Sequence, residues 1–176
     1  NVGGLIGNNY STSSNTYSVK NSHALGEINA SGSDYVGGLI GFNKGNYLSD
    51  VSAAEAVTGR YEVGGLVGRN ENSNISNATT KTGQDVRGHS IVGGLVGNNY
   101  STSATLGIID NAKANSAVWG QNIATVDDAI FGGLVGVNSR FATIKNSTAT
   151  GIVVASKGAK QAMVGGLVGR NEGWVT

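Results

Sequence analysis

The chain has 176 residues, with 29 glycines, no proline or cysteine, 6% aromatic residues, 13% charged residues and a net charge of +1. An average protein has roughly 25% charged residues, so this chain is poor in them. With a net charge of +1, it lacks the basic stripe that nucleic-acid binding needs. No apolar run approaches the ~18 residues of a membrane-spanning helix. Its hydrophobic residues, 39% of the chain and mostly small, exclude a disordered polymer, and its glycines lack the three-residue period of collagen.

A motif of the form Val-Gly-Gly-Leu-[Val/Ile]-Gly-x-Asn occurs six times along the chain. Its first glycines are separated by 34, 27, 29, 39 and 33 residues. The Gly-Gly pairs are Gly3 and Gly4, Gly37 and Gly38, Gly64 and Gly65, Gly93 and Gly94, Gly132 and Gly133, and Gly165 and Gly166. The leucines are Leu5, Leu39, Leu66, Leu95, Leu134 and Leu167. The third glycines are Gly7, Gly41, Gly68, Gly97, Gly136 and Gly169, and the asparagines are Asn9, Asn43, Asn70, Asn99, Asn138 and Asn171.

A second, weaker motif lies between these copies and reads apolar-x-[Asn/Asp]-small. Its copies are centred on Asn21, Asp50, Asn77, Asn111 and Asn146, of which the Asp50 copy is the loosest. Each unit therefore contains two short strand candidates separated by turns rich in Gly, Asn and Ser.

The six units also show a longer period of three. Residues 8–13 (Asn-Asn-Tyr-Ser-Thr-Ser) recur at 98–103, and residues 69–71 (Arg-Asn-Glu) recur at 170–172. Unit one therefore resembles unit four, and unit three resembles unit six. This pattern indicates a duplicated block of three units.

These repeats predict an all-β fold, a β-solenoid (parallel β-helix) of about six coils. Helical repeats would need amphipathic stretches of roughly 10–15 residues, and glycine costs about 1 kcal/mol per helical position relative to alanine. The units are too short for propeller blades of about 40 residues. In a solenoid, equivalent strands stack about 4.8 Å apart. We expect residues 1–176 to form one such segment, cut from a longer array.

The motif has a clear role in stacked coils. We expect the Val, Leu and Ile positions to face a dry interior, with the Gly-Gly pair turning the chain inward through positive φ and allowing close approach of the backbone. The repeated asparagine suits a ladder of side-chain amides at a turn, and it tolerates the left-handed backbone that a turn requires.

The sequence contains no arrangement that indicates catalysis, and we predict a non-enzymatic protein without cofactor or metal. His23 and His89 lie in variable stretches without a catalytic signature, which favours ordinary surface histidines. The longest interval, between Asn99 and Phe131, holds Trp119 and the acidic pair Asp127 and Asp128. We interpret it as a protruding contact loop. The pair is more readily explained as solvated than as catalytic or Ca²⁺-binding.

The six motif copies resemble the GLUG repeat, and the resemblance runs from Val2 to Asn171. GLUG repeats occur in large bacterial surface and secreted proteins, including filamentous-haemagglutinin-like adhesins and non-catalytic regions of immunoglobulin A peptidases. The resemblance implies a β-helical stalk or adhesive rod that is extracellular or on the cell surface. It implies no catalytic residue, since the peptidase zinc motif is missing from this sequence. The long fifth interval and Phe131 in place of valine depart from the repeat.

Three functions remain open from the sequence. The first is a structural or adhesive rod whose variable residues, such as Tyr10, Tyr17, Tyr47, Tyr100 and Trp119, contact a host surface, a glycan or a sister filament. The second is an accessory solenoid of a secreted peptidase or polysaccharide-processing enzyme. The third is a filament subunit that associates end to end.

Overall fold

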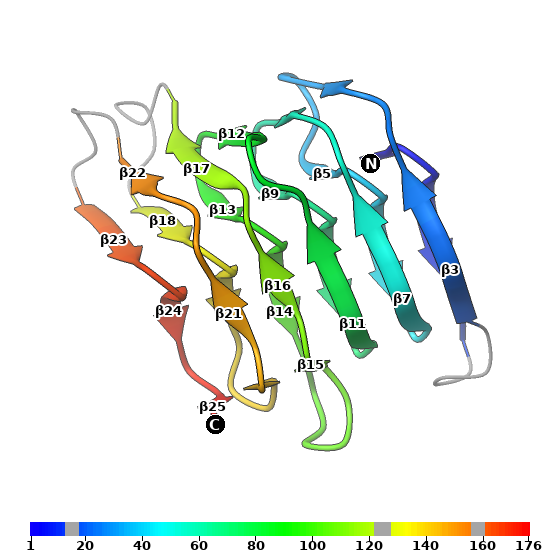
Figure 1. Ribbon diagram of the computed structural model, residues 1–176. Coiled ribbons are helices and arrows are strands. Elements are labelled where there is room, and N and C mark those ends of the chain that lie inside the picture. Colours follow the sequence, from blue (N-terminus) through cyan, green and yellow to red (C-terminus); the bar gives the residue numbers. More distant parts are fainter. Residues whose placement is uncertain (13–17, 122–127, 156–160) are drawn as a thin grey trace.

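The computed structural model describes residues 1–12, 18–121, 128–155 and 161–176, and all regular elements in these ranges are β-strands (Figure 1). The strands form four parallel sheets, which we name A to D, and the chain visits them in that order once per coil. Five complete coils are followed by the first three strands of a sixth, which confirms the predicted solenoid of about six coils. In Figure 1 the coils follow one another from the N-terminus on the right to the C-terminus on the left.

Sheets A and B are built from the main repeat motif. Sheet A holds the strands that end on the first glycine: β1 (Val2–Gly3), β5 (Tyr35–Gly37), β9 (Glu62–Gly64), β13 (Ile91–Gly93), β18 (Asp128–Gly132) and β23 (Gln161–Gly165). Sheet B holds the strands that begin after the leucine: β2 (Ile6–Tyr10), β6 (Ile40–Lys44), β10 (Val67–Glu71), β14 (Val96–Tyr100), β19 (Val135–Asn138) and β24 (Val168–Asn171).

Sheets C and D contain the rest of each coil. Sheet C carries the second motif and consists of β3 (Ser18–Ala24), β7 (Tyr47–Ala53), β11 (Asn74–Thr80), β15 (Ile108–Asp110), β16 (Lys113–Ala114), β20 (Thr143–Lys145), β21 (Thr148–Ala149) and β25 (Trp174–Val175). Sheet D consists of β4 (Ile28–Asn29), β8 (Val57–Thr58), β12 (Asp85–Gly88), β17 (Ala117–Gly120) and β22 (Val153–Val154).

Neighbouring coils are held in strict register. The first glycines of all six motif copies pair with one another across sheet A, from Gly3 to Gly165. Because side chains alternate between the two faces of a strand, a slip of one residue would turn the apolar set outward. The repeated sequence therefore stacks identical residues in columns, although the intervals between copies differ in length.

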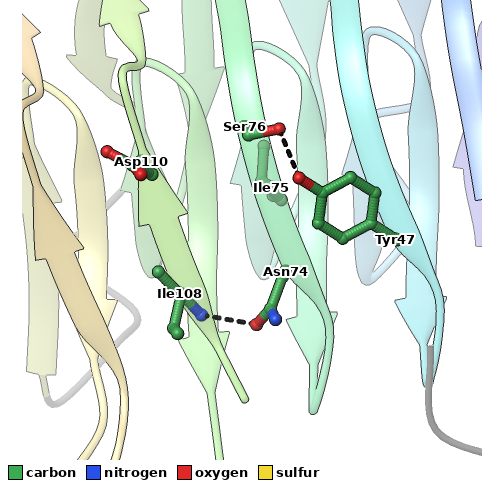
Figure 2. A pocket seen from close by; sticks show the side chains of 6 residues that line it. All are labelled: Tyr47, Asn74, Ile75, Ser76, Ile108 and Asp110. Atoms are coloured by element: carbon green, nitrogen blue, oxygen red, sulfur yellow. Dashed lines mark hydrogen bonds between the residues drawn. The ribbon is translucent and has the colours of Figure 1, made fainter. Parts of the chain in front are cut away.

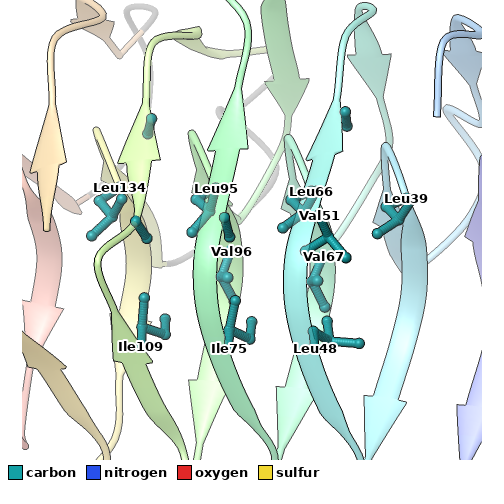
Figure 3. Close-up of a cluster of buried hydrophobic side chains, with 14 of the residues drawn as sticks. Leu39, Leu48, Val51, Leu66, Val67, Ile75, Leu95, Val96, Ile109 and Leu134 are labelled. Carbon is teal, nitrogen blue, oxygen red and sulfur yellow. The ribbon is translucent and has the colours of Figure 1, made fainter. Parts of the chain in front are cut away.

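The core consists of these apolar columns. The motif leucines of the inner coils, Leu39, Leu66, Leu95 and Leu134, are 0% exposed and pack against sheet C residues such as Leu48 and Ile75 (Figure 3). A second cluster joins the sheet A column Val36, Val63, Val92 and Phe131 to the valines of sheet D. The prediction that motif Val and Leu positions face inward is confirmed, and Phe131 occupies the valine column rather than disturbing the coil.

The glycines of the Gly-Gly pairs are needed because they have no side chain, not because they adopt a positive φ. Positive φ among described glycines occurs at Gly45, Gly83 and Gly107, none of which belongs to a Gly-Gly pair, so that part of the prediction was wrong. The pairs are needed because the bend between sheets A and B brings backbones into contact. A Cβ on Gly64 would overlap the carbonyl oxygen of Val67 and lie 2.8 Å from the nitrogen of Gly97. The expected close approach of the backbone is thus confirmed.

The predicted asparagine ladder spans all six units. Each Nδ2 donates to the Oδ1 of the next coil, from Asn9 to Asn43 (2.8 Å), Asn70 (3.0 Å), Asn99 (2.9 Å), Asn138 (3.1 Å) and Asn171 (2.9 Å). The four inner asparagines are 0% exposed. A buried amide without a hydrogen-bond partner is costly. The ladder asparagines find their partners only when neighbouring coils are in register, so the ladder favours that register.

The left-handed backbone belongs to the second motif, not to the ladder. Positive φ occurs at all five second-motif centres, Asn21, Asp50, Asn77, Asn111 and Asn146, and also at Asn72. Non-glycine residues seldom adopt this conformation, but Asn and Asp do so because their short side chains bond locally. The expectation of a left-handed conformation at the ladder asparagines was therefore wrong. The second motif marks the bend within sheet C.

We predict that Asn77, with φ of 50°, is more tolerant of glycine than of alanine. Asn77→Ala and Asn77→Gly both remove the amide that bonds Asp50 and Asn111, so their difference isolates the backbone. Asn77→Ala should be less stable than Asn77→Gly by about 1 kcal/mol, because a Cβ is strained in the left-handed region. Urea unfolding of the two variants measures this difference, and equal stability would refute the backbone explanation.

Candidate functional site

The predicted contact aromatics do not gather on one surface. Tyr10 and Tyr100 lie at the ends of sheet B strands, Tyr47 begins a sheet C strand, and Trp119 lies in sheet D. Tyr10 is 57% exposed, whereas the other three are only partly exposed. Tyr17 lies outside the described residues. These aromatic residues therefore do not form one common binding surface.

Trp119 is part of the solenoid wall rather than of a protruding loop, so this prediction was wrong. It lies in β17, where its Nε1 donates to Asp85 Oδ1 at 2.9 Å and the Arg87 guanidinium lies 5.6 Å from its ring centroid. Asp128 is exposed at the start of β18, and Asp127 lies outside the described residues. The described segment of this interval that extends beyond neighbouring turns is residues 101–107, just before β15 (Figure 1).

A charged cluster lies where the outer faces of sheets A and B meet. Arg69 of β10 bonds Glu62 of β9 at 3.0 Å and Glu71 at 3.2 Å, and Lys44 bonds Glu71 at 2.8 Å. Asn98 donates to Glu62 at 2.9 Å, so the cluster joins three successive coils. This cluster cannot be predicted from any single repeat unit. Opposite charges at Glu62 and Arg69, on either side of one motif copy, were the available signal.

Aromatic rings enclose the cation of this cluster. The Arg69 guanidinium carbon lies 5.8 Å from the ring centroid of Tyr35 and 5.1 Å from that of Tyr100. Phe42 stacks on Tyr35 at 5.8 Å between centroids. Since Arg69 is surrounded by two carboxylates and two rings, its charge is paired within the cluster. The cluster stabilises the A–B bend and presents no unpaired charge to a ligand.

The two carboxylates of the cluster respond to pH in opposite ways. Burial raises the pKa of Glu62 despite the hydrogen bonds from Asn98 and Arg69. Partial burial acts to raise the pKa of Glu71 as well, but the bonds from Lys44 and Arg69 outweigh it and the pKa is lowered. Glu71 thus contributes stability that is lost as pH falls through its folded-state pKa. Ionised Glu62 costs stability at neutral pH, and that cost disappears on acidification.

Removing the cation should expose the cost of burying Glu62. Arg69→Met leaves a carboxylate that is 4% exposed without its counter-ion, and we expect a loss of about 3 kcal/mol of unfolding free energy. The double variant Glu62→Gln/Arg69→Met should lose less than the single variant, because no charge then remains buried. Arg60→Met is the control, since Arg60 and its partner Asp34 are both more than half exposed. Guanidinium unfolding would contradict this account if the double variant were as unstable as Arg69→Met.

A surface pocket of about 190 Å³ lies on the outer face of sheet C. Its lining residues are Tyr47, Asn74, Ile75, Ser76, Ile108 and Asp110 (Figure 2). The Tyr47 hydroxyl bonds Ser76 Oγ at 2.8 Å, and Asn74 Oδ1 accepts from the backbone nitrogen of Ile108 at 3.0 Å. The pocket exists because Asn74 and Ser76 are short, whereas Tyr47 and Ile108 stand on either side of them.

The chemistry of this pocket suits a polar, hydroxyl-rich ligand. A hydrogen bond from Asn146 lowers the pKa of Asp110, so its carboxylate remains ionised at neutral pH. The pocket therefore offers an aromatic ring, a hydroxyl, an amide and a carboxylate within a small concave area. Lys145 lies 3.3 Å from Asp110 and partly neutralises it.

The grouping of titratable side chains in the described residues bears on metal binding. Within them, no three His, Asp or Glu side chains are grouped in a way that could hold a metal ion. His23 Nδ1 and Ser52 Oγ lie 2.8 Å apart on an exposed face, and among the described residues no carboxylate bonds either side chain. In the part of the chain that the structure describes, no helix has the length and apolar character to cross a membrane.

Two segments of the chain match the family model of the GLUG motif, residues 59–81 and 130–154. They correspond to most of coils 3 and 5. A stretch of 48 residues is 52% identical to a protein of Evansella cellulosilytica assigned as a Gly-rich membrane protein. This stretch is 27% of the present chain and 5% of that protein.

The fold is similar to a crystal structure of a Bacteroides ovatus protein assigned as an immunoglobulin A1 protease. The alignment has a TM-score of 0.63 and 19% identity, and it covers 98% of this chain and 55% of that one. At this identity the likeness establishes the solenoid fold alone. The chain spans only about half of the solved structure and a small fraction of the sequence relative.

Proposed function

Since the chain is a GLUG-repeat segment of a bacterial protein, we propose that it serves as a non-enzymatic rod in a large cell-surface or secreted adhesin. The observation that supports this function is the unbroken asparagine ladder, which ties every coil to the next through buried side chains. Solenoid stability is the sum of coil stabilities and nearest-neighbour interfaces, so such a rod resists bending and can be lengthened by adding coils. The alternative is an accessory solenoid of a secreted peptidase or polysaccharide-processing enzyme, in which the same rod would hold other domains apart.

Single-molecule pulling tests the rod function. With the chain held between two marker domains, we expect it to stay folded at low force and then release coils in steps. Each coil has 27–39 residues, and a released residue adds at most about 3.3–3.6 Å. Smooth extension from the lowest forces, as in a flexible linker, would exclude a load-bearing rod.

The sheet C pocket supports a second, adhesive function, the binding of a saccharide. Its aromatic ring and polar side chains match the hydroxyls and apolar faces of a sugar. A glycan array should show binding that Asp110→Asn and Tyr47→Ala weaken, whereas Tyr61→Ala, an exposed tyrosine elsewhere, leaves it unchanged. Binding that survives both pocket variants would assign adhesion to another surface. Glycan products released on incubation would contradict the non-enzymatic function.

A further inference from the structure

The outer face of sheet C carries a column of residues that alternate in size along the solenoid. Strand pairing places one residue of every coil in this column. In chain order they are Ser18, Tyr47, Asn74, Ile108, Thr143 and Trp174. The residue that follows in the inner strands, Ile75, Ile109 or Ile144, is buried, so the column itself faces solvent.

The large members of the column lie in every second coil. Tyr47, Ile108 and Trp174 belong to coils 2, 4 and 6, and the short polar residues belong to the coils between them. Because neighbouring strands lie about 4.8 Å apart, the large side chains recur roughly every 10 Å. The place of Trp174 in the column is fixed by its pairing with Thr143, and not by its exposure.

The pocket of about 190 Å³ is one interval of this pattern. It lies over coil 3, with Tyr47 on one side and Ile108 on the other (Figure 2). The column repeats the arrangement over coil 5, where Thr143 lies between Ile108 and Trp174. The outer face of sheet C thus offers two similar intervals in line along the solenoid axis.

The groups beside these intervals are polar but carry little net charge. Ser76, Asp110 and Lys145 form the next outward column, two residues further along each strand. Lys145 lies 3.3 Å from Asp110, so their opposite charges compensate each other. This surface therefore suits a ligand with many hydroxyls and no charge of its own.

A linear chain of sugar rings has a matching period. In a chain of equatorially linked pyranoses, each ring is about as long as one coil spacing, and successive rings are turned over relative to each other. The same feature of the chain therefore recurs at every second ring. Laid along the solenoid axis, such a chain places the apolar face of alternate rings on Tyr47, Ile108 and Trp174. The hydroxyls of the rings between them meet Asn74 and Thr143.

We propose that sheet C binds a neutral linear polysaccharide that runs along the solenoid axis, with one sugar ring over each coil. This inference rests on the saccharide-binding function proposed above, and it adds the class of saccharide and its direction on the rod. A coiled or branched glycan loses the match after one interval. Since both intervals belong to one surface, a chain that spans them gains affinity from each.

An oligosaccharide series on the unmodified chain tests the match. The probes are β-1,4-linked glucose oligomers of two, three and five rings, which can reach one, two and three of the large side chains. Isothermal titration calorimetry should show an affinity that rises about tenfold at three rings and again at five. The α-1,4-linked five-ring oligomer, whose chain coils, should bind no better than the β-linked two-ring oligomer.

Two variants separate the two intervals. Tyr47→Ala and Trp174→Ala should each lower the affinity for the β-linked five-ring oligomer about tenfold. Trp174→Ala should leave the affinity for the three-ring oligomer nearly unchanged, because that oligomer still reaches Tyr47 and Ile108. Tyr61→Ala is the matched control and should change neither affinity, since Tyr61 is 46% exposed but lies outside sheet C.

Equal affinity for the β-linked oligomers of two and five rings, or for the β- and α-linked five-ring oligomers, would overturn the proposal. So would a glycan array on which only branched or acidic saccharides bind. If Tyr47→Ala abolished that array binding, the saccharide-binding function would still stand without the linear match. An array without any bound glycan would overturn both.

Discussion

Gly93→Ala is expected to destabilise the solenoid by more than about 3 kcal/mol, because overpacked backbone cannot move aside within stacked coils. A Cβ at this position would overlap the carbonyl oxygen of Val96 and lie 2.8 Å from the nitrogen of Gly136. Both groups belong to the backbones of stacked strands. A movement that relieves the overlap in one coil therefore displaces the next coil. Guanidinium unfolding followed by circular dichroism measures the loss.

Gly32→Ala is the matched control for this substitution. No atom lies within 4 Å of the Cβ that alanine would add there, and Gly32 is not among the described glycines with positive φ. Its unfolding free energy should change by no more than about 0.5 kcal/mol. If both alanine variants were equally stable, the glycine columns would not be the cause of the tight A–B bend.

Asn99→Ala is expected to cost about 3 kcal/mol or more, because the loss of one buried amide leaves several groups unpaired. Asn99 is 0% exposed, accepts from Asn70, and donates to Asn138 and to the backbone oxygen of Gly107. Alanine supplies none of these bonds, and water cannot reach the site without opening the coil.

Asn29→Ala provides the comparison, since Asn29 is exposed in β4 of the outermost coil. We expect a change within about 0.5 kcal/mol. Hydrogen exchange adds a local measurement. Relative to the unmodified chain, Asn99→Ala should speed the exchange of backbone amides in coils 3 to 5 more than in coil 1. A uniform effect along the chain, or no effect, would contradict a ladder of nearest-neighbour bonds.

The columns of the core and the asparagine ladder could be predicted because repetition determines them. When Leu39, Leu66 and Leu95 recur at one motif position, any stacked arrangement places them together, and the requirement to bury them sets the register. The same reasoning located the ladder, since Asn43 and Asn70 can satisfy each other only across neighbouring coils.

Backbone conformation was harder to predict because asparagine serves two purposes. Asn70 bonds across coils with an ordinary backbone, whereas Asn77 bends sheet C with positive φ. Each lies directly after a polar residue and two or three residues after an apolar one, Val67 for Asn70 and Ile75 for Asn77, so composition alone does not separate them. Positive φ was wrongly predicted at the glycine pairs for a similar reason, since glycine can supply either positive φ or space for a close backbone approach.

The non-repeated residues were the least predictable. The length of its interval predicted a loop at Trp119, but the residue lies in β17, and residues 101–107 take up part of the extra length. The charged cluster at Glu62 and Arg69 depends on Asn98 from the next coil, and it appears only once the A–B bend is known. The pocket beside Tyr47 likewise results from short residues in one coil lying between larger ones in its neighbours.

The most direct test of the stacking account is the proximity of residues one repeat apart. Lys113 and Thr148 pair in register on the exposed face of sheet C, and the natural chain has no cysteine. Lys113→Cys/Thr148→Cys should react with dibromobimane to give the fluorescent intramolecular cross-link in high yield.

Ser52→Cys/Thr148→Cys uses the same column but is separated by three strand spacings, roughly 14 Å. This pair should give almost no cross-link at the same thiol concentration. Efficient cross-linking of the first pair alone is the result that stacked parallel coils require. Equal yields from the two pairs, or none from the first, would show that successive repeats do not stack in this register.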